Sequence, residues 1–242
     1  MTPGFATLAE RNRQPELMDQ PGLDEGQHAH ALRSLSRINA VSRTSAVIWG
    51  PIKKLARENH LARPLRILDV ACGGGDVVQG LAQRAARAGI AAHVDGCDIN
   101  EVAIAHAREA ALRRRVSNVG FFQHDALRTP LPDGYDVVTC SLFLHHLEND
   151  DAGAMLKAMA TAATRMVVVS DLRRSRFGYA LACIACQLLT RSPIVHVDGP
   201  LSVAAAFTIE EARDLATRSG LAGLTITKNF PERFLLVWRK PL

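Results

Sequence analysis

Three consecutive glycines at positions 73–75 constrain the fold of this chain more than any other feature of its sequence. They stand between an apolar run, residues 65–71, which predicts a buried strand, and a helical pattern over residues 76–88. Backbone without Cβ atoms turns sharply from strand to helix and lets a ligand lie against its amides. Three glycines exceed what a turn needs. The sequence therefore favours a ligand-binding loop over the alternative, a tight turn that binds nothing.

Downstream of residue 64 the chain alternates apolar strands with helices. The expected strands cover residues 65–71, 92–97, 119–123, 135–141 and 166–170, and the expected helices cover 76–88, 101–114 and 150–164. Near-continuous apolar strands separated by helices are typical of a parallel sheet covered on both faces, with right-handed crossovers. Two last strands, 224–228 and 234–239, are predicted to form a closing hairpin. The predicted fold class is α/β, a doubly wound, Rossmann-like sheet.

The remaining segments divide the chain. Residues 1–27 are rich in Pro, Gly, Gln and acidic residues without a period, which predicts a flexible arm. Residues 28–63 form an N-terminal helical segment in which Gly50-Pro51 predicts either two helices or one kinked helix. Residues 64–242 form the sheet domain. Its insert, residues 172–207, breaks the alternation with an apolar helix and a loop over 195–200.

The composition argues against several kinds of partner and cofactor. The net charge is +5, but the arginines are scattered and aromatic residues make up 5%, too few for a platform that stacks bases, so we expect no nucleic-acid partner. No apolar run reaches the roughly 20 residues of a membrane span, and no signal peptide is evident, which predicts a cytoplasmic protein. The five cysteines form no even framework, and Cys183 and Cys186 lack the second pair that a zinc site needs, so we expect no metal. The apolar helix 178–189 offers an interface for a homodimer.

Two acidic residues stand at the ends of the next two strands. Asp98 ends the second strand, 23 residues after Gly75, where a carboxylate can accept hydrogen bonds from a ribose diol. Asp125 ends the third strand, where it can accept from an adenine amino group. Singly, each acid also suits a helix cap or a surface charge. A dinucleotide fingerprint fits only in part, because Val78 occupies the place of its third glycine.

This constellation resembles the class I S-adenosylmethionine-dependent methyltransferases, over residues 65–239. Asp69, Gly73 and Gly75 match the family's acid-x-Gly-x-Gly-x-Gly motif, and Ala71 replaces its first glycine. The resemblance implies a seven-stranded sheet with an antiparallel last strand. It implies that residues 73–75 line the methionine moiety, Asp98 holds the ribose and Asp125 the adenine amine. The implied S-adenosylmethionine site comprises Asp69, Ala71, Gly73, Gly74, Gly75, Asp98, Ile99, which would pack on the adenine ring, Asp125, Ala126 and Ser141, with Arg43 as a candidate partner of the methionine carboxylate.

The predicted acceptor comes from a finer resemblance. The chain resembles small-molecule methyltransferases that act on phenolic, quinone or polyketide-like acceptors. The N-terminal helical segment and the insert would both cover the acceptor. His145 and His146 follow the fourth strand near the implied methyl position, and we favour His146 as the base over the alternative that both are structural. His196 and Asp198, in the expected loop, are candidates to orient an acceptor hydroxyl.

The predicted function is methyl transfer from S-adenosylmethionine to a hydroxyl of a small aromatic acceptor. Three alternatives stay open at this point. One is methylation of carbon on a quinone-type ring, which needs the same cofactor site. The second is an NAD(P)-dependent oxidoreductase on a similar sheet, and the third is a methyltransferase-like protein that binds without turnover.

Overall fold

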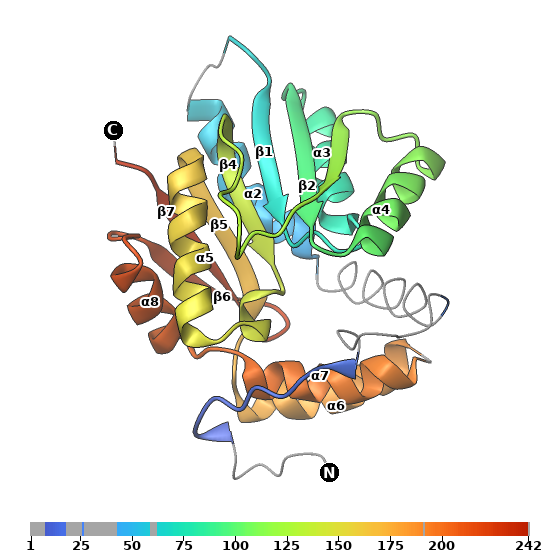
Figure 1. The fold of residues 1–242 in the computed structure, drawn as a ribbon, viewed down its shortest axis with the longest axis vertical. Coiled ribbons are helices and arrows are strands. Elements are labelled where there is room, and N and C mark those ends of the chain that lie inside the picture. Colours follow the sequence, from blue (N-terminus) through green and yellow to red (C-terminus); the bar gives the residue numbers. More distant parts are fainter. Residues whose placement is uncertain (1–7, 18–25, 27–42, 59–61, 191, 242) are drawn as a thin grey trace.

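The computed structural model describes residues 8–17, 26, 43–58, 62–190 and 192–241. Its centre is a seven-stranded sheet in the order β3-β2-β1-β4-β5-β7-β6 (Figure 1). The strands are β1 (Leu65–Val70), β2 (Ala92–Asp98), β3 (Val119–Gln123), β4 (Tyr135–Ser141), β5 (Ala163–Leu172), β6 (Thr225–Asn229) and β7 (Arg233–Arg239). Strands β1 to β5 pair in parallel, and β7 runs antiparallel to both β5 and β6. The predicted fold class and closing hairpin are confirmed.

Helices cover both faces of the sheet. On one face lie α2 (Thr44–Glu58), α3 (Asp76–Arg87) and α4 (Glu101–Arg113), and on the other lie α5 (Asn149–Ala162) and α8 (Ile209–Arg218). The short 3-10 helix η3 (Leu144–His146) follows β4, while α6 (Arg176–Leu189) and α7 (Pro193–Ala205) pack together beyond the ends of the strands (Figure 1). Strand order reverses at β1, whose neighbours are β2 and β4, so ligands are expected at the carboxyl end of β1.

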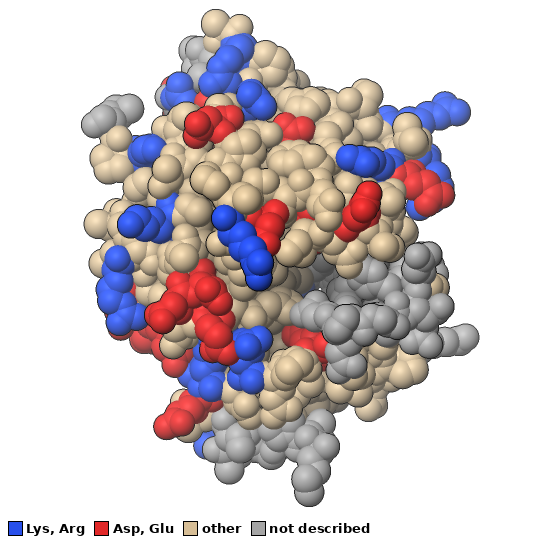
Figure 2. All heavy atoms as spheres, viewed as in Figure 1, with Lys and Arg blue, Asp and Glu red and all other residues tan. Residues whose placement is uncertain are grey.

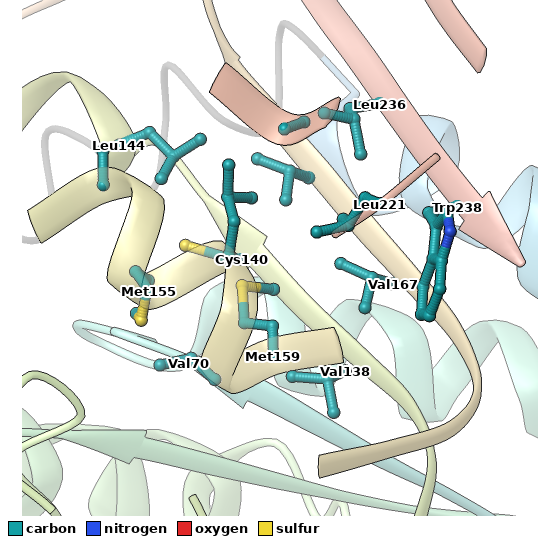
Figure 3. Close-up of a cluster of buried hydrophobic side chains, with 14 of the residues drawn as sticks. Val70, Val138, Cys140, Leu144, Met155, Met159, Val167, Leu221, Leu236 and Trp238 are labelled. Atoms are coloured by element: carbon teal, nitrogen blue, oxygen red, sulfur yellow. The ribbon is translucent and has the colours of Figure 1, made fainter. Parts of the chain in front are cut away.

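Burial on both faces explains why the central strands are mostly apolar. All but the last residue of β4 are buried, because helices cover both sides of a central parallel strand. On one face, Met155 and Met159 of α5 pack toward Cys140 of β4 and Val167 of β5 (Figure 3). Each fully buried side chain of this size stabilises the fold by roughly 1.5–3 kcal/mol. Cys140 is one of the free cysteines and serves as a small buried apolar side chain.

Of the two outcomes predicted at Gly50-Pro51, two helices or one kinked helix, the structure has a single helix, because α2 continues through both residues. A proline inside a helix removes one backbone hydrogen bond and costs about 3 kcal/mol. Burial offsets this cost, since Ile48 and Ile52 are fully enclosed against the sheet and Trp49 nearly so. Tertiary packing therefore overrides the local signal. Residues 28–42 of the predicted helical segment lie outside the described residues.

The loop predicted over residues 195–200 is wrong, because these residues belong to α7. Pro193 occupies the first helical turn, where proline is tolerated, while Pro200 lies inside the helix. Val195 and Val203 are buried. The helix α5 ends at Ala162 and β5 begins at once, three residues earlier than the predicted strand.

Residues 8–17, here called the N-terminal strap, fall within the predicted flexible arm, and the structure ties them to the sheet domain. The Asn12 amide donates to the Ala204 carbonyl at 3.1 Å, and the Leu17 amide donates to Asp198 at 2.9 Å. Figure 1 shows part of this segment in dark blue alongside α7. The rest of the arm lies outside the described residues.

Three observations bear on possible partners. In Figure 2, basic and acidic side chains are interspersed on the face shown, without a continuous basic stripe. None of the helices in the described part of the chain has both the length and the apolarity that a membrane crossing requires. The helix α6 exposes Phe177, Ile184 and Leu188, which keeps the homodimer interface a prediction.

Candidate functional site

The loop between β1 and α3 adopts the backbone that its glycines predicted. Gly73 and Gly75 have φ of 50° and 73°, in the left-handed region. Ala71, in the place of the motif's first glycine, has φ 55°, which costs an ordinary residue roughly 1–2 kcal/mol. A Cβ on Gly75 would lie 2.6 Å from the Phe121 ring and 2.8 Å from the Ala107 methyl. The loop therefore requires glycine at this point both for its conformation and for space.

Asp98, at the end of β2, holds this loop directly. Its Oδ2 accepts a hydrogen bond from the Gly73 amide at 2.9 Å, and its Oδ1 accepts from the Asn100 amide at 2.9 Å. The register of β1 and β2 pairs Val70 with Cys97, so the two strands deliver the loop and the acid to the same edge. The structure thus brings together the residue predicted for the ribose and the loop predicted for the methionine moiety.

Three carboxylates meet around the loop. Asp69 is buried, and its Oδ1 accepts from the Thr139 hydroxyl at 2.6 Å. Burial raises the pKa of Asp69 to about 7; the Thr139 hydrogen bond opposes that rise, and the charges of Asp76 and Asp98 add to it. Asp76, which sequence reasoning missed, is the first residue of α3. This edge of the sheet therefore favours a cationic group of a ligand over a pyrophosphate.

Asp125 lies one strand further along the same edge. The amide of its neighbour His124 donates to the Asp98 carbonyl at 2.9 Å, so the two predicted nucleoside ligands are adjacent. The Asp125 Oδ1 also accepts from the amides of Leu127 and Arg128, both at 3.1 Å, and so caps its own turn. Ile99, which follows Asp98 in the chain, is 61% exposed and so presents an apolar surface at this edge.

The other predicted cofactor residues occupy less specific positions. Ser141 ends β4 and is half-buried, as are Gly74 in the loop and Ala126 after Asp125. Arg43 is exposed and precedes α2, with φ 54°. The pairing of Arg43 with the cofactor carboxylate stays a prediction.

The histidine pair lies on η3, just beyond the end of β4. His145 is buried, and its Nδ1 lies 2.6 Å from Oδ1 of Asp171 near the end of β5. Burial by itself would raise the pKa of Asp171, but the charge and hydrogen bond of His145 outweigh it and hold that pKa below its usual value. The His146 side chain is 23% exposed, and its ring stacks on Phe143 with centroids 6.0 Å apart.

Glu16 of the N-terminal strap faces both rings. Its Oε1 is 3.9 Å from Nε2 of His145, and its Oε2 is 3.9 Å from Nε2 of His146. The Ser202 hydroxyl of α7 donates to Oε1 at 2.6 Å. Sequence reasoning missed Glu16, since nothing in the local pattern links a residue of an irregular arm to a loop more than a hundred residues later.

Arg11 fixes the strap over η3. Its guanidinium lies 3.9 Å from the centre of the Phe207 ring. It donates hydrogen bonds to carbonyls that end η3 and α7, those of His145, Leu147 and Ala205. The strap is therefore anchored to the same short helix that carries the histidine pair.

His196 and Asp198 are placed by α7 and not by a loop. The His196 Nε2 lies 2.9 Å from the Thr190 carbonyl oxygen. Asp198 is buried and accepts from the Leu17 amide. These contacts hold α7 and the strap in place. The predicted role of both residues in orienting an acceptor stays a prediction.

Arg233 is a further buried charge that sequence reasoning missed. Because β7 is antiparallel, its first residue lies at the carboxyl edge of the parallel strands, opposite Leu172 of β5. Its Nη1 donates to the Thr44 hydroxyl at 2.5 Å. Burial lowers the pKa of Arg233 to about 10, against the opposing charges of Asp171 and Asp76. The sequence offered one signal for Arg233, since it is a charged residue directly before the apolar run 234–238.

Comparisons with known proteins agree with this site. Residues 67–165, which carry the glycine loop, both nucleoside acids and the histidine pair, match the family described as methyltransferase domain. The ubiquinone biosynthesis O-methyltransferase of Aeromonas salmonicida (strain A449) is 32% identical over 132 residues, 52% of this chain and 51% of the relative. The chain thus spans about half the length of the curated relatives it matches.

Solved structures share the fold at low sequence identity. Magnesium protoporphyrin IX methyltransferase from Synechocystis PCC 6803, crystallised with S-adenosylhomocysteine, is 19% identical with a TM-score of 0.53, over 89% of this chain and 84% of that one. Human N-acetylserotonin methyltransferase, in complex with S-adenosylmethionine, is 14% identical with a TM-score of 0.63, over 90% and 57%. Residues 67–165 therefore match a methyltransferase domain, on a fold shared with methyltransferases crystallised with S-adenosylmethionine or S-adenosylhomocysteine.

Proposed function

We propose that this chain transfers the methyl group of S-adenosylmethionine to a hydroxyl of a small aromatic acceptor. The observation that carries the proposal is the hydrogen bond from Gly73 to Asp98, which joins the glycine loop to the acid at the end of β2. In this proposal the loop lies along the methionine moiety and Asp98 accepts from the ribose hydroxyls. Asp125 receives the adenine amine, and Ile99 covers the adenine ring.

Two features support S-adenosylmethionine over a dinucleotide. Val78 occupies the place of the third fingerprint glycine, and its fully buried side chain packs against Gly96 of β2, so the glycine at this helix–strand contact lies on the strand and not on the helix as in the dinucleotide motif. The carboxylates of Asp69, Asp76 and Asp98 gather where a dinucleotide would put its pyrophosphate. A sulfonium or ammonium group is favoured there instead, because opposite charges attract most strongly where burial excludes water.

The bound cofactor supplies an electrophilic methyl group to an in-line displacement. Since charge disappears in that step, alignment of the acceptor contributes more than electrostatic stabilisation. In this proposal the glycine loop and Asp98 position the cofactor, which carries the methyl group and its sulfur. The strap, α6 and α7 lie on the side where we assign the acceptor.

A small aromatic hydroxyl acceptor is supported by the relatives named ubiquinone biosynthesis O-methyltransferase. A phenol has a pKa near 10, so a group that assists loss of its proton speeds transfer by roughly 10²–10⁴-fold. His146 is the predicted group, because its ring is the more exposed of the pair, whereas the His145 ring is enclosed and bonded to Asp171.

Two measurements test the proposal. Calorimetry with S-adenosylhomocysteine should show one binding site per chain, with NADH as the competing dinucleotide. Mass spectrometry should then detect a mass gain of one methylene unit when the protein, S-adenosylmethionine and a panel of hydroxyaromatic compounds are incubated together. Binding of NADH in place of S-adenosylhomocysteine would refute the cofactor assignment. Methylation of ring carbon, read from product fragmentation, would replace the acceptor hydroxyl by the carbon alternative.

A further inference from the structure

Two imidazoles and a carboxylate converge at the carboxyl edge of the sheet, and we propose that Glu16, His145 and His146 bind a divalent transition-metal ion. Their potential ligand atoms all lie within 4.8 Å of one another. Within the described residues, no other group of three or more His, Cys, Asp or Glu side chains meets that condition. The sequence predicted no metal, because its one metal-like spacing was the cysteine pair and Glu16 lies far away along the chain.

The geometry of His145 is that of a metal ligand held by an outer partner. Its Nδ1 lies 2.6 Å from Asp171, so the proton on that side belongs to the hydrogen bond with the carboxylate. In the neutral ring this places the lone pair on Nε2, the atom that faces Glu16 at 3.9 Å. A carboxylate bonded to the far nitrogen is the usual partner of a metal-ligating histidine, because it fixes the tautomer and the ring orientation.

The carboxylate is positioned in the same way. Ser202 donates to Oε1 of Glu16 at 2.6 Å, which sets its orientation between the two rings. Glu16 is 8% exposed and His145 is 3% exposed. When the His145 ring is neutral, its Nε2 lone pair and the buried carboxylate of Glu16 bring two acceptors together, and a cation between them relieves that repulsion.

The distances require a modest adjustment of the side chains. Imidazole and carboxylate ligands lie about 2.0–2.1 Å from zinc, so neighbouring ligand atoms of a tetrahedral site are about 3.3 Å apart. The two 3.9 Å separations, which involve different oxygens of Glu16, would have to close by about 0.6 Å. The widest separation within the group, at most 4.8 Å, would have to close by up to about 1.5 Å. Two histidines and one carboxylate suit zinc, cobalt or iron better than magnesium or calcium, which prefer oxygen ligands.

Three protein ligands leave one position of a tetrahedral ion open. The binding of the ion does not depend on the proposed function, but its consequence for the acceptor does. With the ion bound, His146 is a ligand and not the general base that the sequence predicted. It then serves the acceptor hydroxyl through the ion, which lowers the pKa of an oxygen bound to it.

The test uses the full chain, stripped with a chelator and titrated with Co²⁺. We expect visible absorption bands that saturate at one Co²⁺ per chain and disappear when Zn²⁺ displaces it. Glu16→Gln and His146→Ala should each weaken Co²⁺ binding by about tenfold or more. The His146 side chain is partly exposed and Glu16→Gln keeps the shape of the side chain, so these variants are preferable to a change at His145, which is bonded to Asp171. Thermal unfolding of each variant confirms that it is folded.

Two matched variants control for binding elsewhere. His93→Ala removes an exposed imidazole that lies 3.1 Å from a carboxylate of β2, and Cys183→Ser with Cys186→Ser removes the thiol pair. Both should bind Co²⁺ as the wild type does. No saturable binding below about 100 μM, or wild-type affinity in Glu16→Gln, would overturn the proposal. Calorimetry with S-adenosylhomocysteine on the same samples separates this outcome from failure of the cofactor assignment.

Discussion

Replacing Asp98 by asparagine tests the link between the loop and the cofactor most directly. The substitution keeps the size of the side chain but removes the charge that accepts from the Gly73 amide. A hydrogen bond to a charged group contributes about 1.5–3 kcal/mol, and in the proposed complex the same carboxylate also accepts from the ribose. We therefore expect S-adenosylhomocysteine binding to weaken by about 2–4 kcal/mol, which is about 30-fold to 700-fold in Kd.

Isothermal calorimetry measures this change, and Asp95→Asn is the matched control. Asp95 lies on the same strand three residues earlier and accepts from the Tyr135 hydroxyl at 2.9 Å, away from the glycine loop. Asp95→Asn should leave the Kd within about twofold, because its carboxylate does not contact the site. Equal affinities of wild type and Asp98→Asn, with the variant folded, would show that Asp98 serves the loop alone and that the ribose lies elsewhere.

Three further changes test other parts of the site. His146→Ala should lower methyl transfer about 100-fold or more while the Kd for S-adenosylhomocysteine stays unchanged; equal losses in both would place His146 in cofactor binding. Arg11→Ala should reduce the free energy of unfolding by about 2 kcal/mol, since it leaves partly buried carbonyls unpaired, whereas the more exposed Arg13→Ala should cost under about 0.5 kcal/mol; urea denaturation measures both. Asp69 binds its proton more tightly in the folded chain, with its pKa raised to about 7, so it lowers stability progressively as pH rises from about 4 to about 7. Asp69→Asn should remove that pH dependence, and an unchanged profile would show that Asp69 is ionised in the fold.

The cofactor half of the site was predictable because it is local. A glycine loop after β1 and acids at the ends of β2 and β3 are each read from a few neighbouring residues. Parallel pairing then brings these strand ends to one edge without further information. Asp171 could have been found by the same rule, since it lies at the end of β5.

Elements whose structure depends on packing were predicted less well. The sequence predicted two helices or a kinked helix at Pro51 and a loop at Pro200, yet both residues lie inside continuous helices. Local propensity is worth a few kcal/mol at most. Burial of Ile48 and Ile52 in one case, and of Val195 and Val203 in the other, outweighs it.

By itself, the sequence determined the positions of the strands, the glycine loop and the acids at the strand ends, because strand and turn signals act over a few residues. Only the tertiary structure decided that Glu16 faces His145 and His146, that Asp171 holds His145, and that Arg233 lies at the same edge. These contacts join segments far apart in the chain. Their formation depends on how the strap, η3, β5 and β7 pack, and no local pattern encodes that packing.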